Sequence, residues 1–323
     1  MIKTSILESL HLTNFWEDRE DPYPLNYLVT DDQDLVFLKR GPVKELGKPA
    51  KLLIEIGREE KRQIDVSYLA GLNTGLHRNT LFPYKDGFGL INHDKPELHL
   101  WADLVSEPSV IEVENASNDI DVYDNYLRFA SYDSEENRFV IGIGEKHSPH
   151  EYAKWWAILD VEGDKGVWTE VRRLERQNYP DTCFHYRSDT LEWLNIINLA
   201  AHGGRKFVVT PGGQRTVGRT GKEFEFHILS VFDRDNRLEK NIELEHGRGR
   251  FSTSKQYFLL RPKTKKRIQI YDLNKQTLEY DIPLKPKTNL GDISPNHLMD
   301  ADLRGDRLYV GTSSVLNICS FEH

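Results

Sequence analysis

Acidic residues gather with tyrosines in four short polar segments of the first half of the chain. These segments are EDRED at 17–21, DDQD at 31–34, ENASNDIDVYD at 114–124 and DSEEN at 133–137. Carboxylates attract and steer basic surfaces, and tyrosine is a favoured anchor at protein interfaces. The pattern predicts contacts to a basic protein partner through Asp31, Asp32, Asp119, Asp121, Tyr123, Asp124, Tyr132, Glu135 and Glu136. The competing interpretation is that acidic turns only keep a β-rich protein in solution.

The charge distribution supports an acidic side of the molecule. Residues 1–165 contain 18 Lys and Arg against 31 Asp and Glu, whereas residues 166–323 contain 25 against 20, and the whole chain carries −8. A negative surface repels nucleic acid. We therefore expect no direct nucleic-acid partner, although KTKKR at 263–267 forms a basic run in a predicted hairpin.

Hydrolytic chemistry is the alternative function that the residue types allow. Hard divalent cations prefer oxygen ligands, and Asp121, Asn198, Asp300 and Asp302 could supply them. Positive groups are predicted around the same positions, namely His77, Arg78, Arg187 and Arg250. A glycosidase would instead need two carboxylates about 5–10 Å apart, and with 51 acidic residues such pairs arise by chance. A lactonase-like or glycosidase-like site thus stays an alternative, and we predict no bound metal or other cofactor.

A nucleophile is not evident in the sequence. Cys183 and His185 are two residues apart, so on a strand their side chains share one face, and a Cys–His pair can activate a thiol. Neighbours on one strand are more often structural, and the chain lacks a Gly-x-Ser-x-Gly elbow. Two widely separated cysteines make neither a disulfide framework nor a zinc site. We predict no catalytic residue and two cysteines that serve as small core side chains.

The elements that would position these residues are short strands. Runs of β-branched and aromatic residues alternate with Gly, Asn, Asp and Pro, which is typical of strands joined by turns. The clearest group is YFLLR, RIQIYDL and TLEYDIPL between 257 and 284, with FSTS from Phe251 as a preceding strand. Similar groups have third strands ending near Ile56, Leu104, Leu159, Phe232 and Leu273. The run TLEWLNIINLAA at 190–201 fits helix or strand equally.

The last group, MDADLRGDRLYVGTSSVLNICSF, supplies only three strands before the chain stops. An open sheet edge invites aggregation, so we predict that KTSILESLHL from the N-terminus pairs beside LNICSF. This strand pattern resembles the β-propeller superfamily. The signatures of WD40, sialidase and kelch repeats are absent. The resemblance implies one all-β domain over 1–323, a single β-propeller of about six four-stranded blades closed by the N-terminal strand.

The remaining expectations concern location and role. The N-terminal apolar stretch is broken by Glu8 and His11, no signal-peptide pattern follows, and no run long enough to span a membrane occurs. We expect a cytoplasmic monomer without a membrane partner. The leading functional prediction is a non-catalytic protein-binding propeller. A specific form is an immunity protein that neutralises a basic bacterial toxin, such as a nuclease, with its acidic surface.

Overall fold

The computed structural model of the chain describes residues 3–11, 24–40, 52–57, 62–69, 81–92, 95–113, 125–145, 153–173, 193–215, 223–262, 267–283, 298–312 and 315–322. Within these ranges the chain is all-β apart from one short 3-10 turn, η2 (Ser67–Leu69). No helix in this part of the chain is long and apolar enough to cross a membrane. The chain divides into two compact units, one formed by Met1–Gly87 with Gly247–His323 and the other by Phe88–His246.

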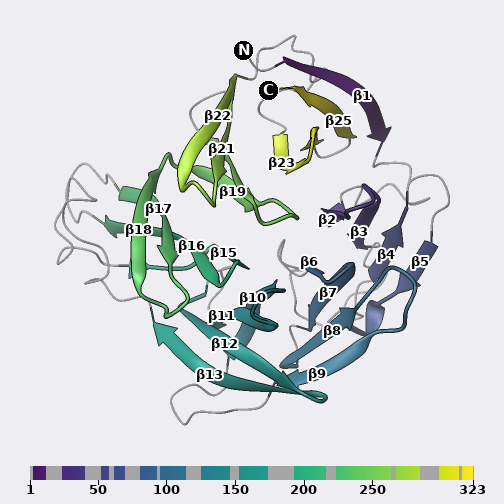
Figure 1. Cartoon of the computed structure of the whole chain (residues 1–323), viewed down its shortest axis with the longest axis vertical. Helices are drawn as coiled ribbons and strands as arrows, with labels where there is room; N and C mark the ends of the chain where they lie inside the picture. Colours follow the sequence, from purple (N-terminus) through teal and green to yellow (C-terminus); the bar gives the residue numbers. More distant parts are fainter. Residues whose placement is uncertain are drawn as a thin grey trace. The chain divides into compact units, whose positions relative to one another are not determined.

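The first unit contains three four-stranded antiparallel sheets, seen as separate groups of arrows in Figure 1. One sheet has the order β2 (Pro24–Val29), β3 (Leu35–Arg40), β4 (Leu52–Ile56) and β5 (Arg62–Asp65). Another runs β19 (Gly247–Phe251), β20 (Tyr257–Pro262), β21 (Arg267–Asp272) and β22 (Thr277–Pro283). The third contains β23 (Leu298–Arg304), β24 (Arg307–Thr312), β25 (Val315–Glu322) and β1 (Lys3–His11). The short strand β6 (Leu81–Tyr84) also belongs to this unit.

In two of these sheets the last strand is far more exposed than the strands before it. In β2 the side chains of Tyr27, Leu28 and Val29 are buried, and all five side chains of β4 are buried. The last strands β5 and β22 are mostly exposed. A meander with one buried edge and one exposed edge is the unit from which β-propellers are built. The fold is therefore all-β and propeller-like, as the strand pattern predicts.

The N-terminal strand completes the last sheet. β1 pairs antiparallel with β25, with Lys3 opposite Glu322 and His11 opposite Val315, and a bulge lies between Ile6 and Glu8. Figure 1 shows β1 along the outer side of β25. Side chains also join the pair, because Ser9 Oγ donates to Asn317 Oδ1 at 2.7 Å. The predicted pairing of the N-terminal segment with LNICSF is confirmed.

The second unit contains two sheets. One includes the meander β10 (Asn125–Asp133), β11 (Arg138–Glu145), β12 (Trp155–Glu162) and β13 (Lys165–Arg173). It continues into β9 (Ser109–Val113), β8 (Glu97–Trp101) and β7 (Gly87–Asn92). The other consists of β14 (Trp193–Leu194), β15 (Asn198–His202), β16 (Arg205–Arg215), β17 (Glu223–Phe232) and β18 (Leu238–Leu244). The run at 190–201, ambiguous in sequence, is thus extended where the structure describes it.

The expected count of about six separate blades is wrong for the described sheets, which number five. The reason is a short parallel contact between two outer strands, β13 and β9, in which Lys165 pairs with Glu112 and Gly166 with Val113. This contact merges two meanders into one continuous sheet. The predicted strand FSTS is also shifted, because β19 ends at Phe251 and the next residues form the turn into β20.

Candidate binding surface at the hairpin turns

The turn between β10 and β11 in the second unit carries two of the predicted contact residues, Glu135 and Glu136. Asp133, only 2% exposed, organises this turn. Its Oδ1 accepts from the backbone N of Glu135 at 3.1 Å, and its Oδ2 accepts from the backbone N of Gly204 at 2.9 Å. The Tyr132 hydroxyl donates to Asn137 Oδ1 at 2.7 Å. The turn is therefore held from both sides by side chains.

A glycine pair in the β15–β16 turn lies against this acidic turn. Gly203 and Gly204 have φ values of 63° and 73°, a conformation that other residues rarely adopt. A Cβ on Gly203 would lie 3.6 Å from Glu135 Oε1, and a Cβ on Gly204 would lie 3.1 Å from Glu136 Oε1. The missing side chains leave room for both glutamates to cross this turn.

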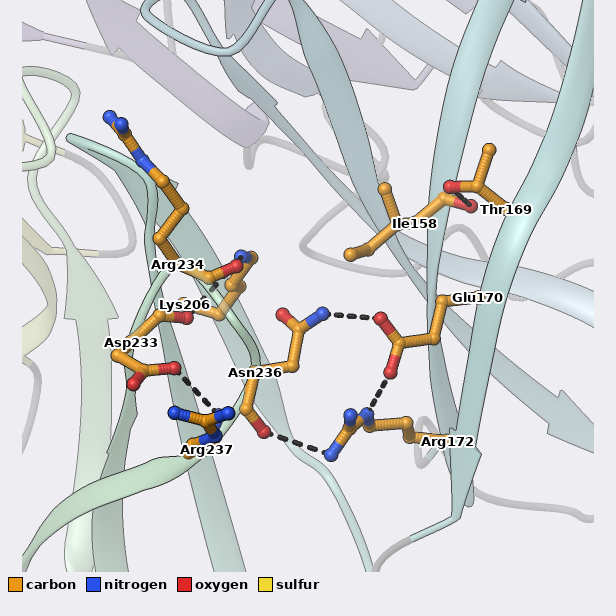
Figure 2. Close-up of polar contacts among 9 residues, drawn as sticks. All are labelled: Ile158, Thr169, Glu170, Arg172, Lys206, Asp233, Arg234, Asn236 and Arg237. Carbon is orange, nitrogen blue, oxygen red and sulfur yellow. Dashed lines mark hydrogen bonds and ion pairs between the residues drawn. The ribbon is translucent and has the colours of Figure 1, made fainter.

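The β17–β18 turn, residues 233–237, contributes the third side of the surface. The backbone N of Arg237 donates to Asp233 Oδ1 at 2.7 Å, and Asn236 lies at φ 61° with its side chain buried. Beneath the turn, Lys206 Nζ donates to the carbonyl oxygens of Asp233 at 3.4 Å and Arg234 at 3.0 Å, as Figure 2 shows. Burial lowers the pKa of Lys206, an effect that the nearby carboxylates partly oppose.

A second set of contacts ties this turn to β13. The Asn236 side-chain amide donates to Glu170, and Arg172 Nη1 donates to the carbonyl oxygen of Asn236 at 2.8 Å. Arg172 also pairs with Glu170 and lies 5.9 Å from the centre of the Trp156 ring. Figure 2 shows these groups on one side of the turn, with the Arg234 side chain directed away from them. Two meanders are thereby joined at the base of the surface.

The exposed face of these turns is of mixed charge rather than acidic. Glu136, with a side chain 19% exposed, pairs through Oε1 with Nε of Arg234 at 2.7 Å, and the Arg234 side chain is 68% exposed. The Glu135 side chain is exposed, and within the described part of the chain its carboxylate has no ion-pair partner. Among the described residues, the turns thus present the Glu135 carboxylate without an ion-pair partner, beside Arg234, which is paired with Glu136.

In the first unit, the turn between β2 and β3 carries Asp31 and Asp32. Thr30 closes it, because its Oγ1 accepts from the backbone N of Asp34 at 3.1 Å. The carboxylate of Asp31 pairs with Arg304, the last residue of β23, and Asp31 and Asp32 are both exposed. Burial lowers the pKa of Arg304. Asp31 therefore has an ion-pair partner within the chain, but 78% of its side chain is exposed, so both acids of this turn face solvent.

The residues proposed for a metal site have other partners where the structure describes them. Asp302, fully buried, accepts from the backbone N of Thr253 at 3.1 Å and from its hydroxyl at 2.6 Å. Arg250 Nη2 lies 3.9 Å from Asp302 and also donates to the carbonyl oxygen of Tyr27. The Asn198 side-chain oxygen accepts from the backbone N of Leu199 at 2.9 Å. Over the described ranges, no group of three or more His, Cys, Asp or Glu is placed to hold a metal ion.

Of the remaining predicted site residues, the structure describes Tyr132 and not the others. Tyr132 is 6% exposed, with its ring 5.1 Å from that of Phe139 and its hydroxyl bound to Asn137. It supports the acidic turn from below because packing fixes its ring in the core. The following residues lie outside the described ranges: Asp119, Asp121, Tyr123, Asp124, Cys183 and His185.

The sequence pattern assigned no part in holding the turns to Asp133, Lys206 or Arg234. A partial signal existed, because the Gly-Gly pair at 203–204 and the segment DRDN at 233–236 are strong turn formers. No pattern in the sequence says that these two turns meet the segment DSEEN.

Comparison with known proteins gives only distant structural likenesses. No family model matches the sequence, and no curated protein matches it. Among solved structures, a hydrazine synthase chain of Kuenenia stuttgartiensis aligns with 9% identity and TM-score 0.48, covering 94% of this chain and 96% of that one. The Cps50 (Swd1) β-propeller domain of Myceliophteria thermophila gives 9% identity and TM-score 0.44, covering 98% and 99%. A periplasmic gluconolactonase of Pseudomonas aeruginosa gives 10% and 0.41, covering 80% and 69%. At these scores the likenesses carry no argument about activity. The description of the fold is based on the observed sheets alone.

Proposed function

We propose that the chain is a non-catalytic binding protein whose hairpin turns dock a basic protein surface. The observation that carries the proposal is the Glu135 carboxylate. It is exposed, its backbone N is held by Asp133, and the side chain lies against Gly203. A carboxylate on a fixed turn loses little conformational freedom when a Lys or Arg of a partner binds it. Glu135 is thus the pre-positioned acidic contact of the second unit.

The proposed contact set keeps the residues from the sequence pattern, with roles refined by the geometry. Asp32 and Glu135 contact the partner directly, whereas Asp31 and Glu136 are held by Arg304 and Arg234. The acidic segment at 119–124 belongs to the same proposal. A toxin domain with a basic active-site cleft, such as a nuclease, remains the specific partner that we propose, with this chain as its cytoplasmic, monomeric inhibitor. It rests on the net charge of −8 and on the acidic first half.

The test is a charge reversal with a matched control. Affinity capture first identifies the partner, and calorimetry then measures its binding to the wild type, Glu135→Lys and Glu243→Lys at several salt concentrations. Glu243 is an exposed acid on β18, so its reversal changes the net charge equally. We expect Glu135→Lys to weaken binding about tenfold or more and to reduce its salt dependence, with a small effect of Glu243→Lys. Equal effects of both variants, or an acidic partner, would overturn the proposal.

A further inference from the structure

The side chain of Arg234 is largely exposed, although several contacts hold the turn that carries it. Its Nε pairs with Glu136 at 2.7 Å, and 68% of the side chain is accessible. Within the described residues, Glu136 is the only ion-pair or hydrogen-bond partner of the Arg234 side chain. Figure 2 shows the guanidinium extending away from the Asn236 and Glu170 contacts. The Nη1 and Nη2 edge therefore faces away from the groups that fix the turn.

The backbone below Arg234 is also fixed. Lys206 donates to the carbonyl oxygens of Asp233 and Arg234, and the side-chain amide of Asn236 donates to Glu170. A Cβ at Gly204 would approach Arg234 Nε to 2.9 Å, so the guanidinium lies directly over that glycine. Both the backbone and the Nε edge of Arg234 are thus held before any ligand arrives.

We propose that Arg234 is an anion-binding residue that takes a carboxylate edge-on through Nη1 and Nη2. A guanidinium binds a carboxylate with two parallel hydrogen bonds. Holding Nε in advance leaves that outer edge available and reduces the entropy lost on binding. A single carboxylate suits the site better than a phosphate dianion, because the exposed neighbour Asp235 and the acidic Glu136 repel a second negative charge.

Arg237 of the same turn provides an internal comparison. Its side chain is 80% exposed, yet its Nη1 lies 3.7 Å from Asp235 Oδ2, which is 69% exposed. One outer nitrogen of Arg237 therefore lies near an exposed acid, and among the described residues its Nε contacts no partly buried acid. If exposure and charge alone decided anion binding, Arg237 would bind at least as well as Arg234.

If the proposed function holds, the two charged groups also specify the charge pattern of the partner surface. Glu135 would take a basic group and Arg234 an acidic one on the same set of turns. The partner surface would then carry Lys or Arg beside Asp or Glu, rather than a uniformly basic patch. Opposite charges placed side by side fix the orientation of a complex and discourage other partners.

The experiment uses nuclear magnetic resonance of the full chain, observing the arginine Nε–Hε signals. Sodium acetate is the probe, with sodium chloride at equal ionic strength as the reference, and Arg234→Lys and Arg237→Lys identify the two signals. We expect acetate to shift the Arg234 signal saturably and at least about threefold more than the Arg237 signal.

Two results would overturn the inference. One is an acetate response equal for Arg234 and Arg237 or linear in concentration. The other is inorganic phosphate binding more tightly than acetate, which would indicate a phosphate site. Because acetate does not test Glu135, failure here leaves the Glu135→Lys measurement to decide the proposed function separately.

Discussion

The carboxylate of Glu136 and the guanidinium of Arg234 join two hairpin turns across Gly204, with 2.7 Å between Oε1 and Nε. The three residues come from three separate turns, after β10, β15 and β17. A side chain at Gly204 would meet the ends of both charged side chains. This arrangement links the conformation of one glycine to the geometry of the proposed binding surface.

Gly204→Ala should therefore be costly for two reasons. Its φ of 73° strains any side chain, and its Cβ would lie 2.9 Å from Arg234 Nε. We expect a loss of roughly 1–2 kcal/mol of unfolding free energy, measured by urea denaturation, because the backbone strain dominates and the exposed end of Arg234 can shift at a small additional cost. Gly163→Ala is the matched control, because Gly163 has φ 69° with no atom near its Cβ position, so only the backbone cost of about 1 kcal/mol applies. Equal losses in both variants would show that the crossing is not tight.

Lys39 and Glu55 form a buried ion pair in the first unit, with Nζ and Oε1 2.7 Å apart and side chains 3% and 2% exposed. Lys39→Met leaves a buried carboxylate without its cation, so we expect a loss of about 3–5 kcal/mol in unfolding free energy. The double variant Lys39→Met/Glu55→Leu removes both charges and should recover most of that loss. A double variant as unstable as the single one would argue against the pair.

His99 should make the chain less stable as the pH falls. Burial lowers its pKa from the ordinary 6.5, and the contact with Glu97, 3.3 Å from Nε2, offsets this only partly. The unfolded chain therefore binds the proton at a higher pH than the folded chain. The stability contribution is present above about 6.5 and is lost as the pH falls from there toward the folded pKa.

Unfolding free energies at pH 7.5 and 5 for the wild type and His99→Gln measure this effect. Glutamine keeps a donor at this position but does not titrate. The wild type should lose more stability than the variant over this interval. Parallel pH dependence of the two proteins would exclude His99 as the source.

The thiol of Cys319 should be unreactive in the folded chain. Burial raises its pKa to about 12, and it lies in the core cluster with Leu308 and Phe321. In a Cys183→Ser background, we expect no labelling by a maleimide at pH 8 in native buffer and complete labelling in denaturant, because the thiolate is the reactive species. Rapid native labelling would contradict the predicted core role of this cysteine.

The N-terminal strand should stabilise the first unit through one face only. Leu10 packs against a core cluster that includes Leu316 and Ile318 of β25, whereas Leu7 at the bulge is 56% exposed. Leu10→Ala should cost about 1–2 kcal/mol of unfolding free energy, and Leu7→Ala about 0.5 kcal/mol or less. Deletion of residues 1–11 should cost far more, since it exposes the β25 edge. Stability unchanged by that deletion would refute the role of β1 in completing the sheet.

The sequence by itself determined the strands and the strand that completes the last sheet. Apolar alternation and turn residues are local signals, so they located β3, β4, β20 and β21 and the unpaired edge beside LNICSF. The same signals placed Asp31 and Glu135 at turns. They misplaced the start of the β19–β22 meander, because FSTS has strand-like residues but closes a turn through Ser252.

Only the tertiary structure decided which turns meet and which charges remain exposed. Glu136 and Arg234 are nearly a hundred residues apart in sequence, so no local pattern pairs them, and the pairing converts an acidic segment into a surface of mixed charge. Tyr132 is buried for a related reason. The alternation of side chains along a strand shows which of them share a face of the sheet, but it does not show which segment covers that face. The described strands form five sheets rather than about six separate blades, because two outer strands, β9 and β13, pair with each other. Contacts between distant segments depend on how meanders pack, and this information is absent from any single stretch of the chain.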